Sequence, residues 1–353
     1  MCESKIMMGI GNCFSQSFSF IRNVFVALLL CIGIPFGLLL CLPIYIFRWI
    51  VFHVAPFMRP DLGKMVTARS SFFAAEDVYK DPKNMAVASL VVNTNKFPTL
   101  DTVFEIANAK ILAARTLTGE MQYPEFQQCL TTWLGFRFWK NNKYFKLEDY
   151  ISLHDPEEIT TEENLKSIQH KMILEPFKQD GCLWEIKLIW NYKEENCEEL
   201  KSVVVFKCHH TLGDGYSLIK IFSKVADMDM KSLSVPNYPK ISFWRKLTTL
   251  IRIPYDIAKF LAIWDENELH KKLTDSNKSN RSVVCLNSNK IPVRIIKEIR
   301  AKYGVCFGAV LNAGFTAAIR ETMVSKGMKV PPSVHCMYPL PFPGHPEKLR
   351  NHM

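Results

Sequence analysis

Two adjacent histidines end an apolar run in the stretch SVVVFKCHHTLGDGYSL, residues 202–218. Asp214 lies four residues beyond the second histidine, and Gly215 follows it. A histidine in such a place can act as a general base, as a metal ligand or as a buried hydrogen-bonding group. The elements expected around the pair favour one of these roles for each histidine.

The run VVVFKCHH has the composition of a β-strand, in which successive side chains point to opposite faces. His209 therefore falls on the face of Lys207, and His210 falls on the apolar face of Phe206 and Cys208. Histidines that point apart do not ligate one metal ion together, and neither has another histidine at helical i+4 spacing. We predict no metal site, a structural hydrogen bond at His209, and a buried, neutral imidazole at His210 that can accept a proton.

The residues after the histidines predict a tight turn. Gly213 and Gly215 are expected to let the chain leave the strand and enter a helix that begins near Tyr216, with Asp214 as its N-cap. The alternative interpretation is purely structural, with a hydrogen-bonded core histidine beside an aspartate that caps the helix. Two histidines, an aspartate and a glycine at four fixed positions should occur by chance in about one in a thousand chains of this length, which favours a functional site.

The elements that must position this turn alternate between strand and helix and predict an α/β fold. The predicted strands cover 85–95, 129–140, 143–153, 182–192 and 200–210, and the predicted helices cover 97–116, 161–174 and 215–228. The last two strands would form a pair joined by a charged turn. After a polar linker at 275–282, two helices at 292–304 and 307–327 are predicted between strands at 282–287 and 331–340.

The N-terminal region carries a membrane signal. Residues 23–47 contain no charge, which is long enough to cross a hydrocarbon core of about 30 Å and too long for the apolar part of a signal peptide. We predict a tail at 1–22 and a membrane segment at 23–52, which Pro35 and Pro43 allow to be a kinked span or a hairpin. Basic residues gather after the segment, so the remainder is expected in the cytosol.

Composition adds two constraints. The 353 residues are 48% hydrophobic, and the 11 cysteines include no C-x-x-C pair, which favours a folded protein in a reducing compartment. The net charge of +10 is dispersed and no nucleic-acid-binding module is recognisable, so we expect no nucleic-acid partner. The basic and aromatic segment 243–264 is either an interfacial membrane helix or a buried crossover, and Pro254 is expected to break it as a single helix.

The stretch HHTLGDG matches the HHxxxDG motif of acyl-CoA-dependent acyltransferases with the chloramphenicol-acetyltransferase-like fold. The chain most resembles the wax ester synthase/diacylglycerol acyltransferase family among them. PFKQDGCLWEIKLI is similar to that family's PLW region, with Cys182 in the place of the proline. VCFGAVLNAGFTAAIRE and SVHCMYPLPF resemble a later helix and strand of the family, although Phe307 and Gly308 stand where the helix usually opens with Asn-Asp.

The resemblance implies a two-layer α/β sandwich behind the membrane segment. Its first half-domain would cover 70–230, a crossover or linker that could lie at the membrane would cover 231–281, and a partial second half-domain would cover 282–353. Family members usually continue further, so the chain is expected to be truncated at its C-terminus.

The resemblance also implies a reaction. His210 would remove the proton of an alcohol, either diacylglycerol or a long-chain alcohol, as it attacks the thioester of acyl-CoA; acyl-CoA is a co-substrate, and no other cofactor is expected. His209, Asp214 and Gly215 would support this base. Leu183, Trp184 and Phe206 would line an acyl channel, with plain core packing as the alternative.

Three functions remain open at this point. The first is an integral membrane acyltransferase with its catalytic part in the cytosol; the endoplasmic reticulum is the expected membrane, with the plasma membrane or a lipid droplet as alternatives. The second is a catalytically impaired relative that binds acyl chains or acts as a scaffold. The third, amide synthesis of the condensation type, is disfavoured because no carrier domain adjoins and a membrane segment is present.

Overall fold

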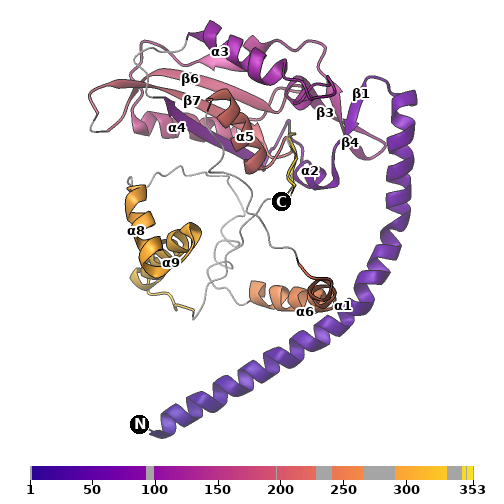
Figure 1. The fold of residues 1–353 in the computed structure, drawn as a ribbon, viewed down its shortest axis with the longest axis vertical. Coiled ribbons are helices and arrows are strands. Elements are labelled where there is room, and N and C mark those ends of the chain that lie inside the picture. Colours follow the sequence, from indigo (N-terminus) through magenta and orange to yellow (C-terminus); the bar gives the residue numbers. More distant parts are fainter. Residues whose placement is uncertain are drawn as a thin grey trace. The chain divides into compact units, whose positions relative to one another are not determined.

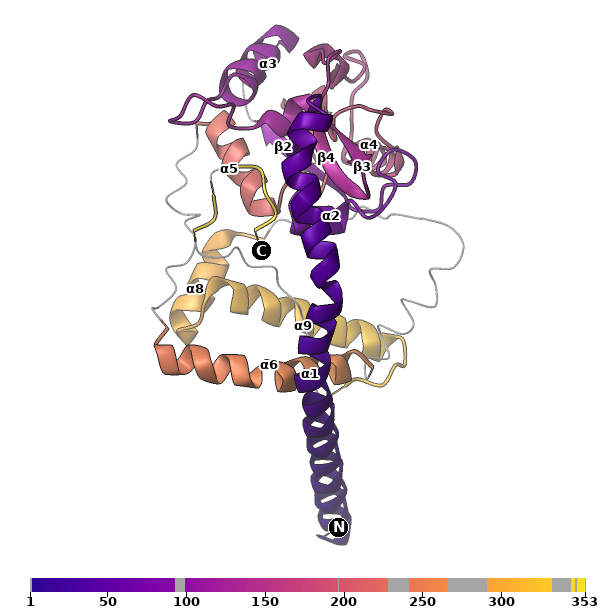
Figure 2. The same ribbon diagram turned by 90° about the vertical axis from the view of Figure 1, so that its right-hand side faces the viewer.

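The computed structural model describes residues 2–92, 99–195, 197–227, 241–265, 291–331, 344–346 and 348–352 (Figures 1 and 2). The linker predicted at 275–282 and the strand predicted at 282–287 lie outside these residues, as does nearly all of the strand predicted at 331–340. The described elements divide into two compact units.

One unit holds two β-sheets. The larger has the order β2-β7-β6-β5, in which the strands are β2 (Met85–Val92), β5 (Ile151–Leu153), β6 (Trp184–Lys193) and β7 (Leu200–His209). The pairings of β7 with β2 and β6 are antiparallel, and β5 runs parallel to β6. The smaller sheet has the order β1-β4-β3, with β1 (Leu62–Met65), β3 (Gln128–Trp133) and β4 (Phe136–Asn141). The α/β class and the strand pair that carries the histidines are confirmed.

The strand β7 is covered on both faces, which is typical of an unbroken apolar run. Val203 and Val205 belong to one buried cluster with Leu165 and Met172 of α4 (Glu162–Leu174). On the opposite face, Phe206 packs edge-on against Phe222 of α5 (Gly215–Val225), with ring centroids 5.0 Å apart. The end of β7 is thereby fixed between two helical layers.

Several elements differ from their predictions. Residues 143–153 form a 3-10 turn, η3 (Leu147–Asp149), followed by the short β5. The turn brings the buried ring of Tyr150 onto Trp184, where the rings stack 5.3 Å apart, so burial of one aromatic residue overrides the apparent strand. The segment 129–140 is the hairpin of β3 and β4, turned by Leu134 and Gly135 at φ 47° and 81°.

The helix predicted at 97–116 is shorter. It comprises α3 (Leu100–Ala107) and a π-helical turn, η1 (Asn108–Leu112). The helix 161–174 begins as expected, with Thr161 accepting a hydrogen bond from the backbone N–H of Asn164. The sequence analysis did not predict β1 or the short helix α2 (Ala68–Phe73).

The first helix, α1 (Cys2–Met58), is continuous through Pro35 and Pro43, so the chain makes no hairpin there. Its segment Ser17–Met58 is long and apolar enough to cross a membrane. The C-terminal end of α1 is anchored on the smaller sheet, where Val51 and Ala55 are buried with Phe138. The long apolar helix expected in the N-terminal region is present, and it also includes residues of the predicted tail.

The other unit contains α1 up to Leu42 together with α6 (Phe243–Asp265), α8 (Val293–Tyr303) and α9 (Phe307–Ser325). Pro254 lies inside α6, so the predicted break is wrong; a proline removes one backbone hydrogen bond, and the helix continues around it. Residues 344–352 belong to the unit with the sheets, whereas α8 and α9 do not. The half-domain boundaries predicted from the sequence stay predictions.

The core of the larger sheet can be tested at Leu188, which is 1% exposed and pairs with Val204. We expect Leu188→Ala to lower the free energy of unfolding by about 2–5 kcal/mol, because the truncation leaves a cavity between packed layers. The matched control is Leu200→Ala, at a strand position that is 39% exposed. Thermal unfolding followed by intrinsic fluorescence in detergent gives the comparison, and equal shifts in Tm would contradict this core.

Candidate active site

His210 is the first residue after β7 and lies at the start of the turn that leads to α5. Its backbone N–H donates to the carbonyl oxygen of Asn84 at 2.8 Å. Its ring stacks on Phe73 of α2, with centroids 4.1 Å apart and planes 18° apart. The side chain is half-buried and not enclosed as predicted, because the strand ends before it. A base that must reach a substrate requires this partial exposure.

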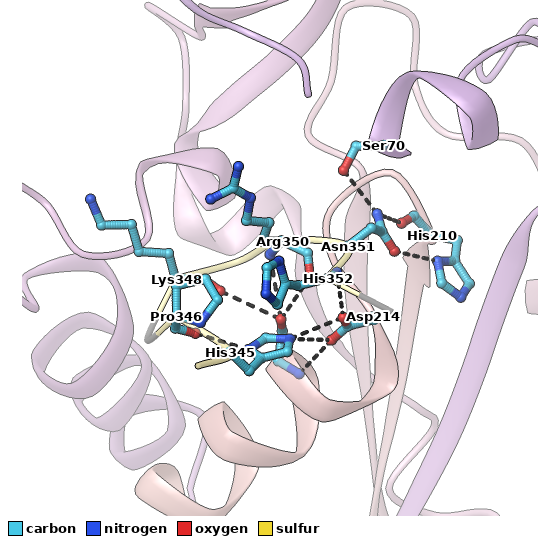
Figure 3. Close-up of polar contacts among 10 residues, drawn as sticks. Ser70, His210, Asp214, His345, Pro346, Lys348, Arg350, Asn351 and His352 are labelled. Atoms are coloured by element: carbon cyan, nitrogen blue, oxygen red, sulfur yellow. Dashed lines mark hydrogen bonds and ion pairs between the residues drawn. The ribbon is translucent and has the colours of Figure 1, made fainter. Parts of the chain in front are cut away.

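Asn351 defines the protonation of this imidazole (Figure 3). The Oδ1 atom of Asn351 lies 3.0 Å from Nδ1 of His210, and its Nδ2 donates to the carbonyl oxygen of His210 at 2.8 Å. An amide oxygen only accepts, so Nδ1 of His210 carries the proton and donates. The lone pair is then on Nε2, which has no hydrogen-bond partner among the described residues.

His209 is held in the opposite way on the other face of β7. Its side chain is 0% exposed, and its Nδ1 accepts from the backbone N–H of Thr211 at 3.2 Å. Its Nε2 therefore carries the proton and donates to Glu76 at 2.8 Å. Burial lowers the pKa of His209 and outweighs the opposing effect of Glu76, so the ring is neutral. The predicted structural hydrogen bond at His209 is present.

Glu76 was not identified from the sequence. Burial raises the pKa of its carboxyl, but hydrogen bonds from Asn84, His209 and Lys83 outweigh it and hold the pKa below the ordinary value. The backbone N–H groups of Lys83 and Asn84 donate to Oε1 at 2.5 and 2.9 Å. Nothing in the local pattern AAEDVYK marks this residue, because its partner His209 is 133 residues away.

Asp214 caps α5 as predicted and also holds the C-terminal segment (Figure 3). Its carboxylate accepts from the backbone N–H of Ser217 at 2.8 Å and from that of His352 at 2.8 Å. Nε2 of His345 lies 3.1 and 3.0 Å from the two oxygens. Burial raises the pKa of Asp214, and these donors more than compensate, so the group is ionised.

The two glycines have different surroundings from those predicted. Neither is among the described glycines with positive φ. A Cβ on Gly213 would lie 3.2 Å from the backbone nitrogen of Arg350, so this glycine permits close approach of the C-terminal segment. A Cβ on Gly215 would meet nothing within 4 Å, and the structure gives no reason for a glycine there.

The three predicted channel residues lie in the main buried cluster. Leu183, Trp184 and Phe206 are 0%, 3% and 5% exposed. The indole N–H of Trp184 donates to the carbonyl oxygen of Phe126 at 2.8 Å, which satisfies its polar atom within the core. These contacts are those of core packing, and a channel along the residues stays a prediction.

No group of three or more metal-ligating side chains occurs within the part of the chain that the structure describes. His209 and His210 each have their own partners, so the pair is not arranged as a joint ligand set. What the site can do chemically is accept a proton at Nε2 of His210.

No family model and no curated protein matches the sequence. Among solved structures, the chain is similar to a wax ester synthase/diacylglycerol acyltransferase from Marinobacter aquaeolei VT8, with 15% identity, a TM-score of 0.42 and coverage of 74% of this chain and 61% of that one. It is also similar to the first condensation domain of the calcium-dependent antibiotic synthetase, with 12% identity, a TM-score of 0.43 and coverage of 74% and 60%.

A third similar structure is the starter condensation domain of rhizomide synthetase RzmA, with 15% identity, a TM-score of 0.34 and coverage of 61% of this chain and 48% of that one. The chain thus spans about three fifths or less of these relatives. In fold, it is similar to acyltransferases and condensation domains.

The buried neutral state of His209 predicts a pH dependence of stability. Its pKa is lower in the folded than in the unfolded chain, so the unfolded chain binds the extra proton and stability falls as the pH drops below about 6.5. We expect the decrease in Tm between pH 7.5 and 5.5 to be smaller in His209→Gln than in the wild type.

The matched control is His154→Gln, because His154 is a partly exposed histidine outside the site, 3.4 Å from Glu158. Differential scanning fluorimetry across this pH range measures all three proteins. An unchanged slope in His209→Gln would contradict the assignment of a buried neutral ring.

Proposed function

We propose that the protein is an acyl-CoA-dependent O-acyltransferase in which Nε2 of His210 is the general base. The observation that carries the proposal is the half-exposed His210, whose Nδ1 donates to Asn351 and whose Nε2 keeps its lone pair. The HHxxxDG resemblance supplies the reaction class, because acyl transfer to an alcohol requires a base at this position of the motif.

The reaction that this base would perform is a direct transfer, which requires neither a metal nor a covalent enzyme intermediate. Nε2 takes the proton of the alcohol as its oxygen attacks the thioester carbonyl, and a tetrahedral oxyanion forms. Collapse of the oxyanion breaks the carbon–sulfur bond, and the imidazolium returns its proton to the CoA thiolate. The products are the ester and free CoA, and His210 is regenerated in its original tautomer.

The acceptor class follows from the membrane segment. A helix as apolar as Ser17–Met58 would place the site at a lipid bilayer, where diacylglycerol and long-chain alcohols partition. We therefore propose neutral-lipid synthesis, either triacylglycerol or wax ester, with the sheet-bearing unit in the cytosol and the endoplasmic reticulum as the membrane.

A second candidate is a membrane-bound relative that binds acyl chains without transferring them. One observation favours it: Trp184 is enclosed by Tyr150 and Phe126, with ring centroids 5.3 and 5.4 Å away, which leaves the expected channel residues packed as core. Phe307 and Gly308 in the place of the family's Asn-Asp are consistent with such a role.

The decisive experiment incubates membranes containing the full chain with labelled acyl-CoA and either diacylglycerol or a long-chain alcohol. We expect ester formation, and His210→Ala should reduce its rate by about 10²-fold or more because the general base is removed. The control His154→Ala, at a histidine of the loop after β5, should leave the rate unchanged.

Two results would contradict the proposal in different ways. Ester formation that is equal in wild type and His210→Ala would exclude His210 as the base. Saturable binding of acyl-CoA by the wild type with no ester from either alcohol would favour the binding relative.

The helix α6 has the pattern of an interfacial membrane helix. Large apolar side chains are exposed along one side, with Phe243 at 70%, Leu250 at 63%, Ile251 at 71% and Leu261 at 52%. At 100° per residue, Arg245, Arg252 and Lys259 fall on the opposite side. Tyr255 lies against Phe20 of α1 in the same unit, with ring centroids 6.2 Å apart. We propose that α6 lies on the bilayer beside α1.

This placement predicts face-specific lipid contact. A photocrosslinking amino acid in place of Leu250 should react with lipid in membranes that contain the full chain, and one in place of Arg252 should not. Leu39 of α1, which is 70% exposed, is the positive control. Detection of labelled lipid on the purified protein gives the answer, and equal labelling at both α6 positions would refute an interfacial helix.

A further inference from the structure

The two motif histidines carry their protons on different ring nitrogens, His209 on Nε2 and His210 on Nδ1. The proton position at His210 depends on Asn351, which is 141 residues away in the sequence. We infer that Asn351 is a positioning residue that holds His210 in the Nδ1–H tautomer, and that Asp214 acts on the base by fixing the segment that carries Asn351. This inference deepens the proposed function and rests on it for the catalytic meaning of His210. The tautomer of His210 and the role of Asn351 in fixing it are inferred from the hydrogen bonds alone.

The orientation of the Asn351 amide is determined by the two acceptors that face its NH2 group. Nδ2 lies 2.8 Å from the carbonyl oxygen of His210 and 2.9 Å from Oγ of Ser70. A backbone carbonyl only accepts, so the NH2 group must face it, and Oδ1 must face the ring of His210. Asn351 is 3% exposed, so water does not supply a ready substitute for these partners.

The orientation of the amide then determines the tautomer. The Nε2–H tautomer of His210 would place the lone pair of Nδ1 against Oδ1 of Asn351 at 3.0 Å, with no donor between the two acceptors. Stacking on Phe73 opposes a turn of the ring out of this contact. The lone pair of a neutral His210 is therefore directed away from Asn351, on the nitrogen that is free to meet a substrate.

Asp214 fixes both neighbours of Asn351. The N–H of His352 donates to the Asp214 carboxylate, and the backbone N–H of Asp214 donates to the carbonyl oxygen of Arg350 at 3.2 Å. Oγ of Ser217 donates to the same carbonyl at 2.9 Å. The residues before and after Asn351 are thus hydrogen-bonded to the start of α5, and this places the Asn351 side chain against His210.

His345 holds the other end of this segment through its contact with Asp214. Its Nδ1 lies 3.0 Å from the carbonyl oxygen of Pro346, and its Nε2 faces the Asp214 carboxylate, so both nitrogens face acceptors. A carboxylate only accepts, so Nε2 of His345 carries a proton and donates it to Asp214. The motif aspartate is therefore a hydrogen-bonding anchor for the segment as well as the cap of α5.

The direct test is the tautomeric state of each histidine, measured by long-range ¹H–¹⁵N correlation NMR on the ¹⁵N-histidine-labelled full chain in nanodiscs. Loss of signals in His209→Gln and His210→Gln assigns the two rings. We expect His210 as Nδ1–H and His209 as Nε2–H. An Nε2–H state of His210 in the wild type would overturn the inference.

Variants separate positioning from folding. Asn351→Ala should convert a measurable fraction of His210 to Nε2–H, whereas Asn351→Asp, which keeps an acceptor at Nδ1, should retain Nδ1–H. Asp214→Asn should behave like Asn351→Ala, and Asp227→Asn, at an exposed aspartate paired with Lys110, is its control. Retention of Nδ1–H in Asn351→Ala would exclude the positioning role, even if that variant is less stable.

Kinetics connect this result to catalysis. A wrong tautomer of a catalytic histidine can lower kcat by up to about 10⁴, so we expect Asn351→Ala to lower kcat at least about tenfold with little change in KM. Absence of ester from the wild type with the expected NMR spectra would defeat the proposed function and leave the positioning contact intact. Full activity in Asn351→Ala would defeat the positioning role and leave the acyltransferase assignment intact.

Discussion

The arrangement of the site depends on one buried charge. Asp214 has no exposed surface, and an ionised carboxylate is stable there only if several donors surround it. The donors come from the first turn of α5, from the backbone of His352 and from His345. One negative charge therefore joins the start of a helix to a segment more than 130 residues further along the chain, and that segment is the source of Asn351.

A second carboxylate, that of the partly buried Glu76, lies on the other side of β7. Glu76 receives the backbone N–H groups of Lys83 and Asn84 and the Nε2–H of His209, so the loop before β2 is closed around it. The same loop presents the carbonyl of Asn84 to the backbone of His210. His210 is thus held through its backbone by the Glu76 network and through its ring by Asn351. Two independent ion-centred networks converge on one imidazole.

Strand alternation in VVVFKCHH was enough to separate the histidines, because a period of two is a local property of the chain. The strand pair, the caps at Thr161 and Asp214 and the apolar N-terminal helix were predictable for the same reason. Glu76, Asn351 and His345 were not, because each meets its partner only after the chain has folded back over 131 to 141 residues. The predicted strand at 143–153 failed because burial of Tyr150 overrides a local preference. The predicted break at Pro254 failed because a helix can continue around a proline with the loss of one backbone hydrogen bond.

The contrast in burial between the histidines decides which of them can be a base. Both nitrogens of His209 are engaged and its side chain has no exposed surface, so a substrate proton cannot reach it without breaking the Glu76 contact. His210 is half-buried, and its Nδ1 donates to Asn351, so its Nε2 is available to a substrate. The proposed role of His210 is the same for any acceptor, because an alcohol that is deprotonated here must approach the nitrogen that Asn351 leaves free.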